Sequence, residues 1–587
     1  MKKIYLYAVA LGMLVTSCED FLTEYPGNKI TPDDFFKNER EINLYANSFY
    51  QRDMPGTEIA SGDKISDITA VVSVDKYLTA GFSPADQGGW GWSDLRNINY
   101  FIDRVKKSPV DEAVRNKYLG LAKFWRAKFY FEKVKTFGGV PYYDYCLAEN
   151  DPALYKGRDS REFVMDKVLE DLYEAVKYSS DTKDETCTTV TRYVALAMKA
   201  RVCLYEGTFR KYHTEMNLPD ADKWLKEAAT AAEAIMTSQK YKLVNTGNPE
   251  TDYRALFTAE NRSGVRKIID EVIWAQVYDT EYRRWHDLTW AYNSATAGSR
   301  WSLIRQFVNT YLMLDGSRFT DKAGYNEMTF PNEVKNRDYR LKQTVRTPGY
   351  KRSTGAVALP DFAITLNGYH MYKWSLDNPF YDGQAEATNA VPIFRYAEIL
   401  LIYAEAKAEL GEFTSIIWDK TIKLLRERAG VIGKEPEMAD TYLQTTFYPG
   451  ISDKYLLEIR RERAIELIAE NHRFDDLMRW KRGDLLAEDA MQWTGIYVPE
   501  LGKGYDMDGD GKADVCFYTG SKPSIPGVTF VKLSDTFTLT DIANNKGNLI
   551  WAKGVQRSWE DKKYLHPIPR NVRVVNPALE QNPNWGD

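Results

Sequence analysis

Acidic residues at regular spacing near the C-terminal end of the chain form its sharpest chemical motif. Asp506, Asp508 and Asp510 stand at positions one, three and five, a glycine follows at six, and Asp514 stands at nine. Carboxylates at this spacing let a loop converge its oxygens on one calcium ion, and the backbone carbonyl of Lys512 would be the ligand at position seven. The motif therefore predicts a calcium site that orders a loop, and no other cofactor is expected.

The motif departs from a complete calcium loop at its last position. Position twelve is Phe517, so the bidentate glutamate of an EF-hand is absent. The ion would need another carboxylate from elsewhere in the chain, or water. The alternative interpretation is a solvated acidic turn without an ion.

Aromatic side chains in loops are the second group of residues that could do chemistry. Sugars present apolar C–H faces and polar rims, so an aromatic ring can cover the face while amides, carboxylates or arginines bind the rim. Trp90 and Trp92 lie in a glycine-rich stretch, and Asn97 is among the polar residues that follow. A second cluster comprises Tyr282, Trp285, Trp290, Tyr292, Asn293 and Trp301. We predict ligand contacts from both groups, with a packing role as the alternative for each single side chain.

Composition limits the class of function. The formal net charge is −5 and the chain has no long basic run, so nothing favours nucleic acid as a partner. The five histidines are scattered and the cysteines lack zinc-site spacing, which argues against a zinc hydrolase. Aromatic residues reach 13%, and aromatic rings with one polar edge favour recognition of amphipathic ligands.

The N-terminus predicts secretion and a lipid anchor. Lys2 and Lys3 precede an apolar run at 4–15 and then small residues, which is the pattern of a secretory signal. The run is about 12 residues, against the roughly 20 that a membrane-spanning helix needs. LVTSC at 14–18 looks like a bacterial lipobox, in which Cys18 becomes the acylated first residue and holds the protein to a membrane. The alternative is an ordinary signal peptide with an incidental cysteine.

Helical periodicity dominates the chain, so the expected fold class is mainly α. Apolar residues at helical spacing predict helices at 114–136, 161–178, 191–207, 220–238, 392–410, 418–429 and 453–470. Successive helices with short turns resemble tetratricopeptide-like hairpins stacked side by side. The stretches 245–300 and 315–390 mix turn formers with aromatics, and the second half is expected to be loop-rich, largely irregular and functional.

Several motifs follow one another along the chain. They are CEDFL at 18–22, KFWRAKFYF at 123–131, FGGVP at 137–141, FRYAEILLIYAEA at 394–406, RERAG at 426–430, RERAIEL at 461–467, HRFDDLMRW at 472–480, and a tail from HPIPR at 566–570 to NPALEQNPNW at 576–585. In these segments and in their order the chain resembles the SusD/RagB-like family, over nearly the whole mature length.

The resemblance implies one compact helical fold and a place on the cell surface. It implies an outer-membrane lipoprotein that caps the extracellular side of a TonB-dependent transporter and delivers glycans, or sometimes peptides, to it. On this basis the chain divides into a signal peptide at 1–17, an N-terminal helical part at 18–245, and a C-terminal part at 246–587 that includes a loop-rich ligand face.

Charged residues inside the motifs are expected to be structural. They stand amid apolar helical positions, where an unpaired charge would cost several kcal/mol, and this predicts ion pairs between helices for Arg395, Glu398, Glu405, Arg461, Glu462 and Glu466. The sequence contains no nucleophile elbow, P-loop or metalloprotease motif. We therefore predict an oligosaccharide-binding protein rather than an enzyme. The alternatives are a peptide-binding or scaffold subunit of such an uptake complex, or a glycoside hydrolase with two catalytic carboxylates.

Overall fold

The structure, a computed structural model, describes residues 35–586. The predicted signal peptide at 1–17 and the predicted lipid attachment at Cys18 lie outside the described residues. Among the described residues, no helix combines the length and the apolar character that crossing a membrane requires. The chain folds mainly as α-helices, which confirms the expected fold class.

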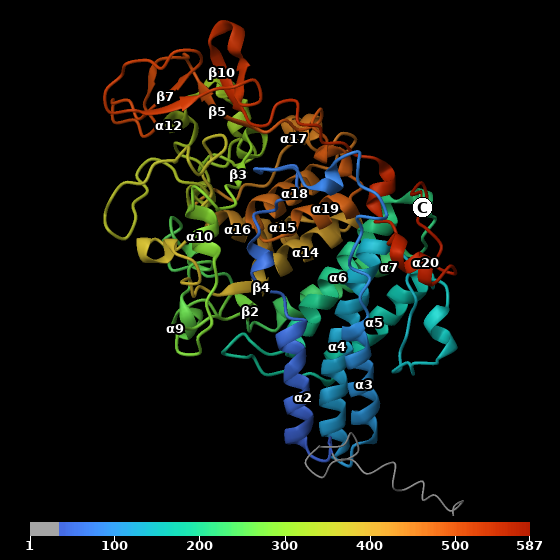
Figure 1. Cartoon of the computed structure of the whole chain (residues 1–587). Coiled ribbons are helices and arrows are strands. Elements are labelled where there is room, and N and C mark those ends of the chain that lie inside the picture. Colours follow the sequence, from blue (N-terminus) through green and yellow to red (C-terminus); the bar gives the residue numbers. More distant parts are fainter. Residues whose placement is uncertain (1–34, 587) are drawn as a thin grey trace, which may run out of the picture.

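The N-terminal part is a layer of antiparallel helices (Figure 1). These are α2 (Glu39–Arg52), α3 (Ser93–Lys107), α4 (Glu112–Phe137), α5 (Arg161–Tyr178), α6 (Arg192–Tyr212) and α7 (Ala221–Thr237). The closest neighbours are α4 with α5 and α6 with α7, so consecutive helices form the predicted hairpins. The hydroxyl of Ser160 accepts a hydrogen bond from the N–H of Phe163 (3.2 Å), which caps α5 at its first turn.

The end predicted for α6 is wrong. The predicted helix stopped at 207, whereas α6 continues through Gly207 to Tyr212. A Cβ atom on Gly207 would lie 2.9 Å from the side chain of Leu225 on α7. The glycine therefore serves close helix packing rather than helix termination.

The second half is built around a central group of helices. They are α14 (Tyr396–Glu409), α15 (Ser415–Lys420), α16 (Ile422–Arg428), α18 (Lys454–Glu466) and α19 (Arg473–Arg479). The predicted helix at 392–410 starts too early, because Val391–Arg395 forms strand β4 against β2 (Val272–Gln276). All five residues of β4 are buried, and Pro392, which has no N–H to donate, stands at a register shift opposite Ala275.

Among residues 35–586, four small sheets lie in the loop-rich regions. β1 (Thr69–Ala70) pairs with β3 (Ser302–Leu303), and β2 with β4. Beyond 490, one sheet contains β5 (Thr494–Val498), β10 (Lys546–Ile550) and β9 (Thr538–Asp541), and another contains β6 (Gly504–Tyr505), β7 (Val515–Tyr518) and β8 (Thr529–Lys532). Short helices lie between the strands along the chain: α8 (Asp252–Ala255), α9 (Asn261–Val265), α10 (Leu288–Asn293), α11 (Arg305–Val308), α12 (Phe330–Glu333), α13 (Tyr339–Thr344) and α17 (Thr441–Thr446). A last short helix, α20 (Arg570–Val575), follows the sheets in the C-terminal tail.

The two halves share their cores. Ile568 and Leu579, from the C-terminal tail, pack into the apolar core of the N-terminal helices. Figure 1 accordingly places α20 beside that layer, while the sheets that contain β5, β7 and β10 lie at the opposite end of the molecule. The boundary between 245 and 246 stays a prediction.

Buried ion pairs join the central helices, as the charged motifs predicted. Arg395 contacts Glu466 (2.6 Å), Glu470 (2.7 Å) and Glu271 (3.1 Å), and Arg340 contacts Glu466 (2.9 Å). The other predicted charges are paired in the same way, in the pairs Glu398–Arg201, Glu405–Arg479, Arg461–Asp440 and Glu462–Arg426. The prediction of interhelical ion pairs is confirmed.

Candidate ligand-binding surfaces

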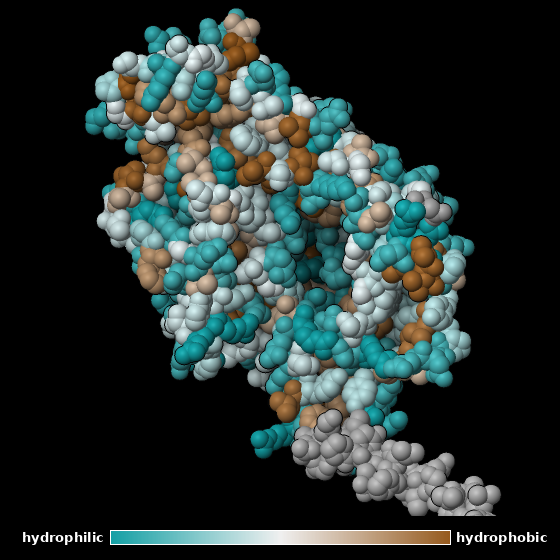
Figure 2. Space-filling view, viewed as in Figure 1, coloured by the Kyte–Doolittle hydropathy of each residue, from teal (hydrophilic) through white to brown (hydrophobic). Residues whose placement is uncertain are grey.

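The first predicted aromatic pair lines the edge of a hollow. Trp90 and Trp92 are half-buried against α4, where the ring centroid of Trp90 lies 4.9 Å from that of Phe137. They border a cavity of about 490 Å³ between α3, the stretch at 141–155 and α20, which we call the α20 hollow. Its walls are mostly apolar, and beside it Val574 and Val575 are 76% and 69% exposed. Figure 2 shows apolar surface gathered over the part of the molecule where Figure 1 labels α20.

The polar residues at the α20 hollow are not those that the sequence singled out. Asn97 is not among its lining residues, whereas Arg96 and Asn99 are, because side chains three apart on α3 share one face. The amide of Asn99 already donates to the carbonyls of Tyr143 (3.0 Å) and Tyr145 (3.1 Å). Asn99 therefore holds the wall of the hollow in place.

The second predicted cluster is divided by the fold. Tyr282 is 51% exposed and lines a separate hollow beside α9, and Trp285 is 39% exposed. Tyr292 is buried and its hydroxyl donates to the carbonyl of Ala60 (3.1 Å), so its role is packing. Only part of the cluster can reach a ligand directly.

Trp290 and Asn293 belong to α10, and Trp301 packs against Tyr292 of the same helix. Trp290 and Asn293 are three residues apart on this helix, and both are half-buried, as is Trp301. The Asn293 amide donates to Asp382 (2.8 Å) and accepts from Arg346 (3.0 Å). Burial lowers the pKa of Arg346, yet no carboxylate lies within 4.0 Å of it among residues 35–586.

The α10 region extends to residues that the sequence did not indicate. The indole N–H of Trp551 donates to the carbonyl of Val71 (3.0 Å), and the guanidinium of Arg300 lies 6.0 Å from the Trp551 ring. Trp551 follows β10, whereas Val71 follows β1, which pairs with β3 just after Trp301. No local pattern could have joined these segments. We call Trp290, Asn293, Arg300, Trp301 and Trp551 the α10 surface.

The backbone supports Trp301 closely. Gly62 has φ +70°, and a Cβ atom there would lie 2.5 Å from the Trp301 ring. The other neighbour is Tyr292, whose ring centroid lies 5.0 Å away. Trp301 is therefore fixed before any ligand arrives, which lowers the entropy lost on binding.

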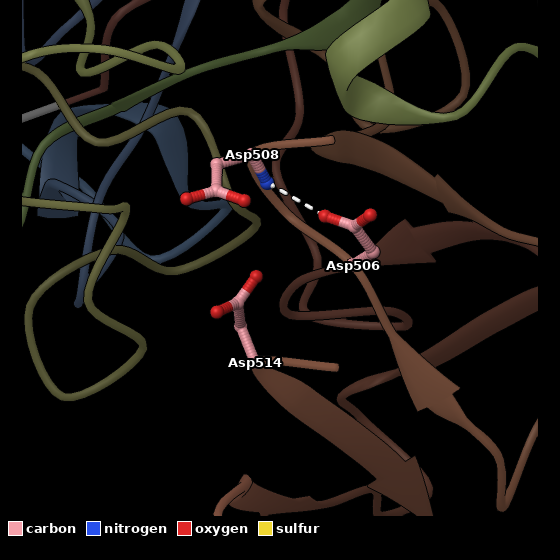
Figure 3. Close-up of side chains that lie close together, drawn as sticks. All are labelled: Asp506, Asp508 and Asp514. Carbon is pink, nitrogen blue, oxygen red and sulfur yellow. Dashed lines mark hydrogen bonds between the residues drawn. The ribbon is translucent and has the colours of Figure 1, made fainter. Parts of the chain in front are cut away.

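The acidic motif forms the loop of the hairpin between β6 and β7. Carboxylate oxygens of Asp506, Asp508 and Asp514 lie within 4.8 Å of one another, and Figure 3 shows the carboxylates of Asp508 and Asp514 facing each other. Burial and the neighbouring aspartates raise the pKa of Asp514. No Lys or Arg within the described chain pairs with these three groups, so a divalent cation would fit their charge.

Other positions of the predicted calcium loop fit less well. Asp510 is not part of the cluster, and its carboxylate lies 3.5 Å from the ammonium of Lys512. Phe517, at position twelve, is buried in β7 and offers no carboxylate. The residues that could hold the ion are thus Asp506, Asp508 and Asp514, with the remaining ligands from backbone oxygens or water.

Two family models match this sequence. The model described as "SusD family" matches residues 270–585, and the model described as "Starch-binding associating with outer membrane" matches residues 91–204. SusD-like proteins of Formosa agariphila are similar over most of their length. One is 24% identical over 514 residues, which cover 81% of this chain and 90% of that protein.

Solved structures share the fold. A SusD-like protein from Bacteroides fragilis has a TM-score of 0.67 at 22% identity, covering 96% of this chain and 100% of that one. A structure described as a SusD-like carbohydrate binding protein, also from Bacteroides fragilis, has a TM-score of 0.66 at 19% identity, with 93% and 100% covered. A surface glycan-binding protein A from Bacteroides fluxus has a TM-score of 0.57 at 18% identity, with the same coverage. At these identities the likeness concerns the fold.

Proposed function

Because this chain belongs to the SusD family, we propose that it binds carbohydrate at the cell surface and passes it on without converting it. One family model that it matches is described as starch-binding and associated with the outer membrane. Two structural neighbours are described as binding carbohydrate or glycan. These descriptions support a carbohydrate ligand and leave the particular glycan open to experiment.

The α10 surface is the proposed glycan site. The observation that carries this proposal is the hydrogen-bonded chain from Arg346 through Asn293 to Asp382. Asn293 stands three residues after the half-buried Trp290 on α10, so the two side chains share one face of this helix. A ring can cover the C–H face of a sugar, while amide, carboxylate and guanidinium groups at its edge bind the hydroxyl rim. Since Trp290 lies on α10 and the ring of Trp301 packs against Tyr292, the surface needs little rearrangement to receive a ligand.

We further propose that Cys18 carries lipid and that a TonB-dependent transporter in the outer membrane is the partner. The α20 hollow supports a protein partner, because its apolar lining and the exposed Val574 and Val575 suit burial in an interface better than contact with water. Capture of the transporter by wild-type protein, and its loss in a Val574→Asp/Val575→Asp variant, would support this placement. Capture that is unchanged would contradict it.

Calcium is proposed as a structural ion at Asp506, Asp508 and Asp514. Bound there, it would neutralise three converging carboxylates and fix the loop between β6 and β7. Its role is to order this loop, and none of the three carboxylates belongs to the α10 surface.

Binding of purified protein to a panel of plant, host and microbial glycans tests the function. Affinity electrophoresis and calorimetry would detect saturable binding, and chromatography of the glycan afterwards would detect any cleavage. Saturable binding without product is expected. A cleaved product would replace the proposal with a hydrolase, and binding of peptides alone would replace it with a peptide receptor.

A further inference from the structure

A second hollow, of about 430 Å³, opens beside α9. Three segments form it: the loop at 184–189, α9 with the residues after it, and the turn at 279–284. Val265 and Val277 belong to its apolar lining, whereas Arg262, Arg266 and Arg284 belong to its polar lining. We call it the α9 hollow; Figure 1 shows α9 at the lower left of the molecule, below α10 and to the left of β2.

One of these arginines positions an aromatic ring. Nη1 of Arg262 donates to the hydroxyl of Tyr282 (2.9 Å), and the guanidinium carbon lies 4.0 Å from the centroid of the Tyr282 ring. The contact fixes the ring, although 51% of the Tyr282 side chain is exposed. A fixed and exposed tyrosine is suited to contact a sugar.

The other two arginines have no acidic partner. Arg266 and Arg284 are exposed, and neither lies within 4.0 Å of a carboxylate in the part of the chain that the structure describes. Two unpaired guanidinium groups in the lining of one hollow offer an anion two charged donors. The planar guanidinium also matches a carboxylate or sulfate in two-point geometry.

Two carboxylates in the same lining limit the charge that the hollow can accept. Asp279 accepts the backbone N–H of Glu281 (2.9 Å) and so shapes the turn, and Glu185 is exposed. The lining also contains the hydroxyl groups of Thr186 and Thr188, which lie 2.6 Å apart. The lining thus contains three arginines and two carboxylates, which leaves one net positive charge. This charge suits a sugar that bears one acidic group beside its hydroxyl groups.

We propose that the α9 hollow is a subsite for an acidic sugar residue, one that bears a carboxylate or a sulfate. Arg266 and Arg284 bind the anionic group, Tyr282 contacts the sugar ring, and Thr186 and Thr188 bind its hydroxyl groups. This inference rests on the proposed carbohydrate binding and narrows its ligands to glycans that contain acidic residues.

The test compares acidic oligosaccharides with neutral counterparts of equal length by calorimetry. One arm uses oligogalacturonides and their methyl esters, and a second uses sulfated oligosaccharides and their desulfated forms, which separates carboxylate from sulfate recognition. We expect at least one acidic ligand to bind about tenfold more tightly than its neutral form, as one charge-assisted contact contributes. That preference should weaken as salt increases.

Variants locate the preference. Arg266→Gln/Arg284→Gln should abolish it, and Tyr282→Ala should weaken both forms of the ligand. Arg283→Gln is the matched control, because Arg283 is exposed on the same turn but does not line the hollow. If the acidic and neutral forms bind with equal affinity, or if Arg283→Gln loses as much of the preference as the double variant does, the acidic subsite is overturned. Binding of neutral glycans would in that case leave the proposed function standing. Absence of binding to every glycan would overturn the proposed function as well.

Discussion

Arginine is used in opposite ways in the core and at the α9 hollow. In the core, Arg340 and Arg395 each contact several carboxylates, and both are almost fully buried. At the α9 hollow, Arg266 and Arg284 are exposed and have no carboxylate within 4.0 Å among the described residues. A buried charge without a partner costs several kcal/mol of stability, whereas water solvates an exposed charge and leaves it available to bind a ligand. The difference separates arginines that stabilise the fold from those that can recognise something.

The largest effect should come from breaking a buried pairing. Glu466 contacts Arg340 (2.9 Å), Arg395 (2.6 Å) and Arg428, and although burial opposes ionisation these arginines hold its pKa well below the usual range. Glu466→Gln should lower the free energy of unfolding by about 3–5 kcal/mol, because it leaves buried arginines without their shared partner. Chemical denaturation measures this.

The control is an ion pair at the surface. Lys434 and Glu437 are 2.6 Å apart with both side chains more than half exposed, so Glu437→Gln should change stability little. Similar losses in both variants would contradict the contrast between buried and exposed charges.

Asp63 is a second buried acid, and unlike Glu466 it has no ion pair with an arginine among the described residues. Asp63 is buried, and burial raises its pKa to about 7, although one oxygen accepts the N–H of Ala469 (2.5 Å) and the other has no partner among the described groups. Between about pH 4 and pH 7 the folded state keeps a proton that the unfolded state releases, so stability falls as pH rises through this window. Asp63→Asn should remove this dependence, a relative change of about 4 kcal/mol over the whole window and about 3 kcal/mol above about pH 5.

Denaturation of wild type and Asp63→Asn at about pH 5 and about pH 8 measures the difference. As pH rises from about 5 to about 8, the free energy of unfolding of the variant should increase relative to that of the wild type. A difference that is the same at both pH values would show that Asp63 titrates normally.

At the α10 surface, substitution of two half-buried tryptophans is expected to weaken glycan binding. Trp290→Ala/Trp301→Ala should weaken glycan binding at least about tenfold, since each ring contributes roughly 1 kcal/mol or more. Calorimetry with the best glycan of the panel measures this, and thermal unfolding shows whether the fold persists. Trp90→Ala/Trp92→Ala at the α20 hollow is the comparison, and weakening only in that variant would move the glycan site there.

The smallest effect is expected at the acidic loop. Calcium should raise the unfolding midpoint by about 1 °C, which corresponds to roughly 1 kcal/mol in a chain of this size. Asp508→Asn/Asp514→Asn should abolish the rise, and Asp510→Asn should keep most of it, because Asp510 lies outside the cluster. If calcium still raises the unfolding midpoint of the Asp508→Asn/Asp514→Asn variant, the ion binds outside this loop.

Local pattern was a good guide to the elements and a poor guide to their ends. The helices at 161–178 and 220–238 were predicted within one residue, because their apolar spacing is a local signal. Gly207 and Pro392 were misread, since a glycine can serve close packing and a proline can stand in a strand as well as open a helix. Which of these applies depends on Leu225 and β2, which are distant in sequence from 207 and 392.

The candidate sites were predicted only in part, for the same reason. Sequence composition identified Trp290, Asn293 and Trp301 as ligand candidates but could not separate them from the buried Tyr292. It gave no sign of Trp551, which approaches Arg300 only because the strand before it returns to this face. Exposure and convergence are properties of packing, so they have no signature in the spacing of residues.

The sequence by itself determined the helical fold class, the family motifs and the pairing of their charges, because periodicity and the desolvation of buried ions act at every position where they occur. Only the tertiary structure decided which aromatics stay accessible, which three aspartates converge and which arginines remain unpaired. Those outcomes depend on how the chain packs, in places through contacts between segments hundreds of residues apart, such as Trp551 with Val71. The chemistry of a side chain determines which kind of partner it requires when buried, and the tertiary structure determines which residue is that partner.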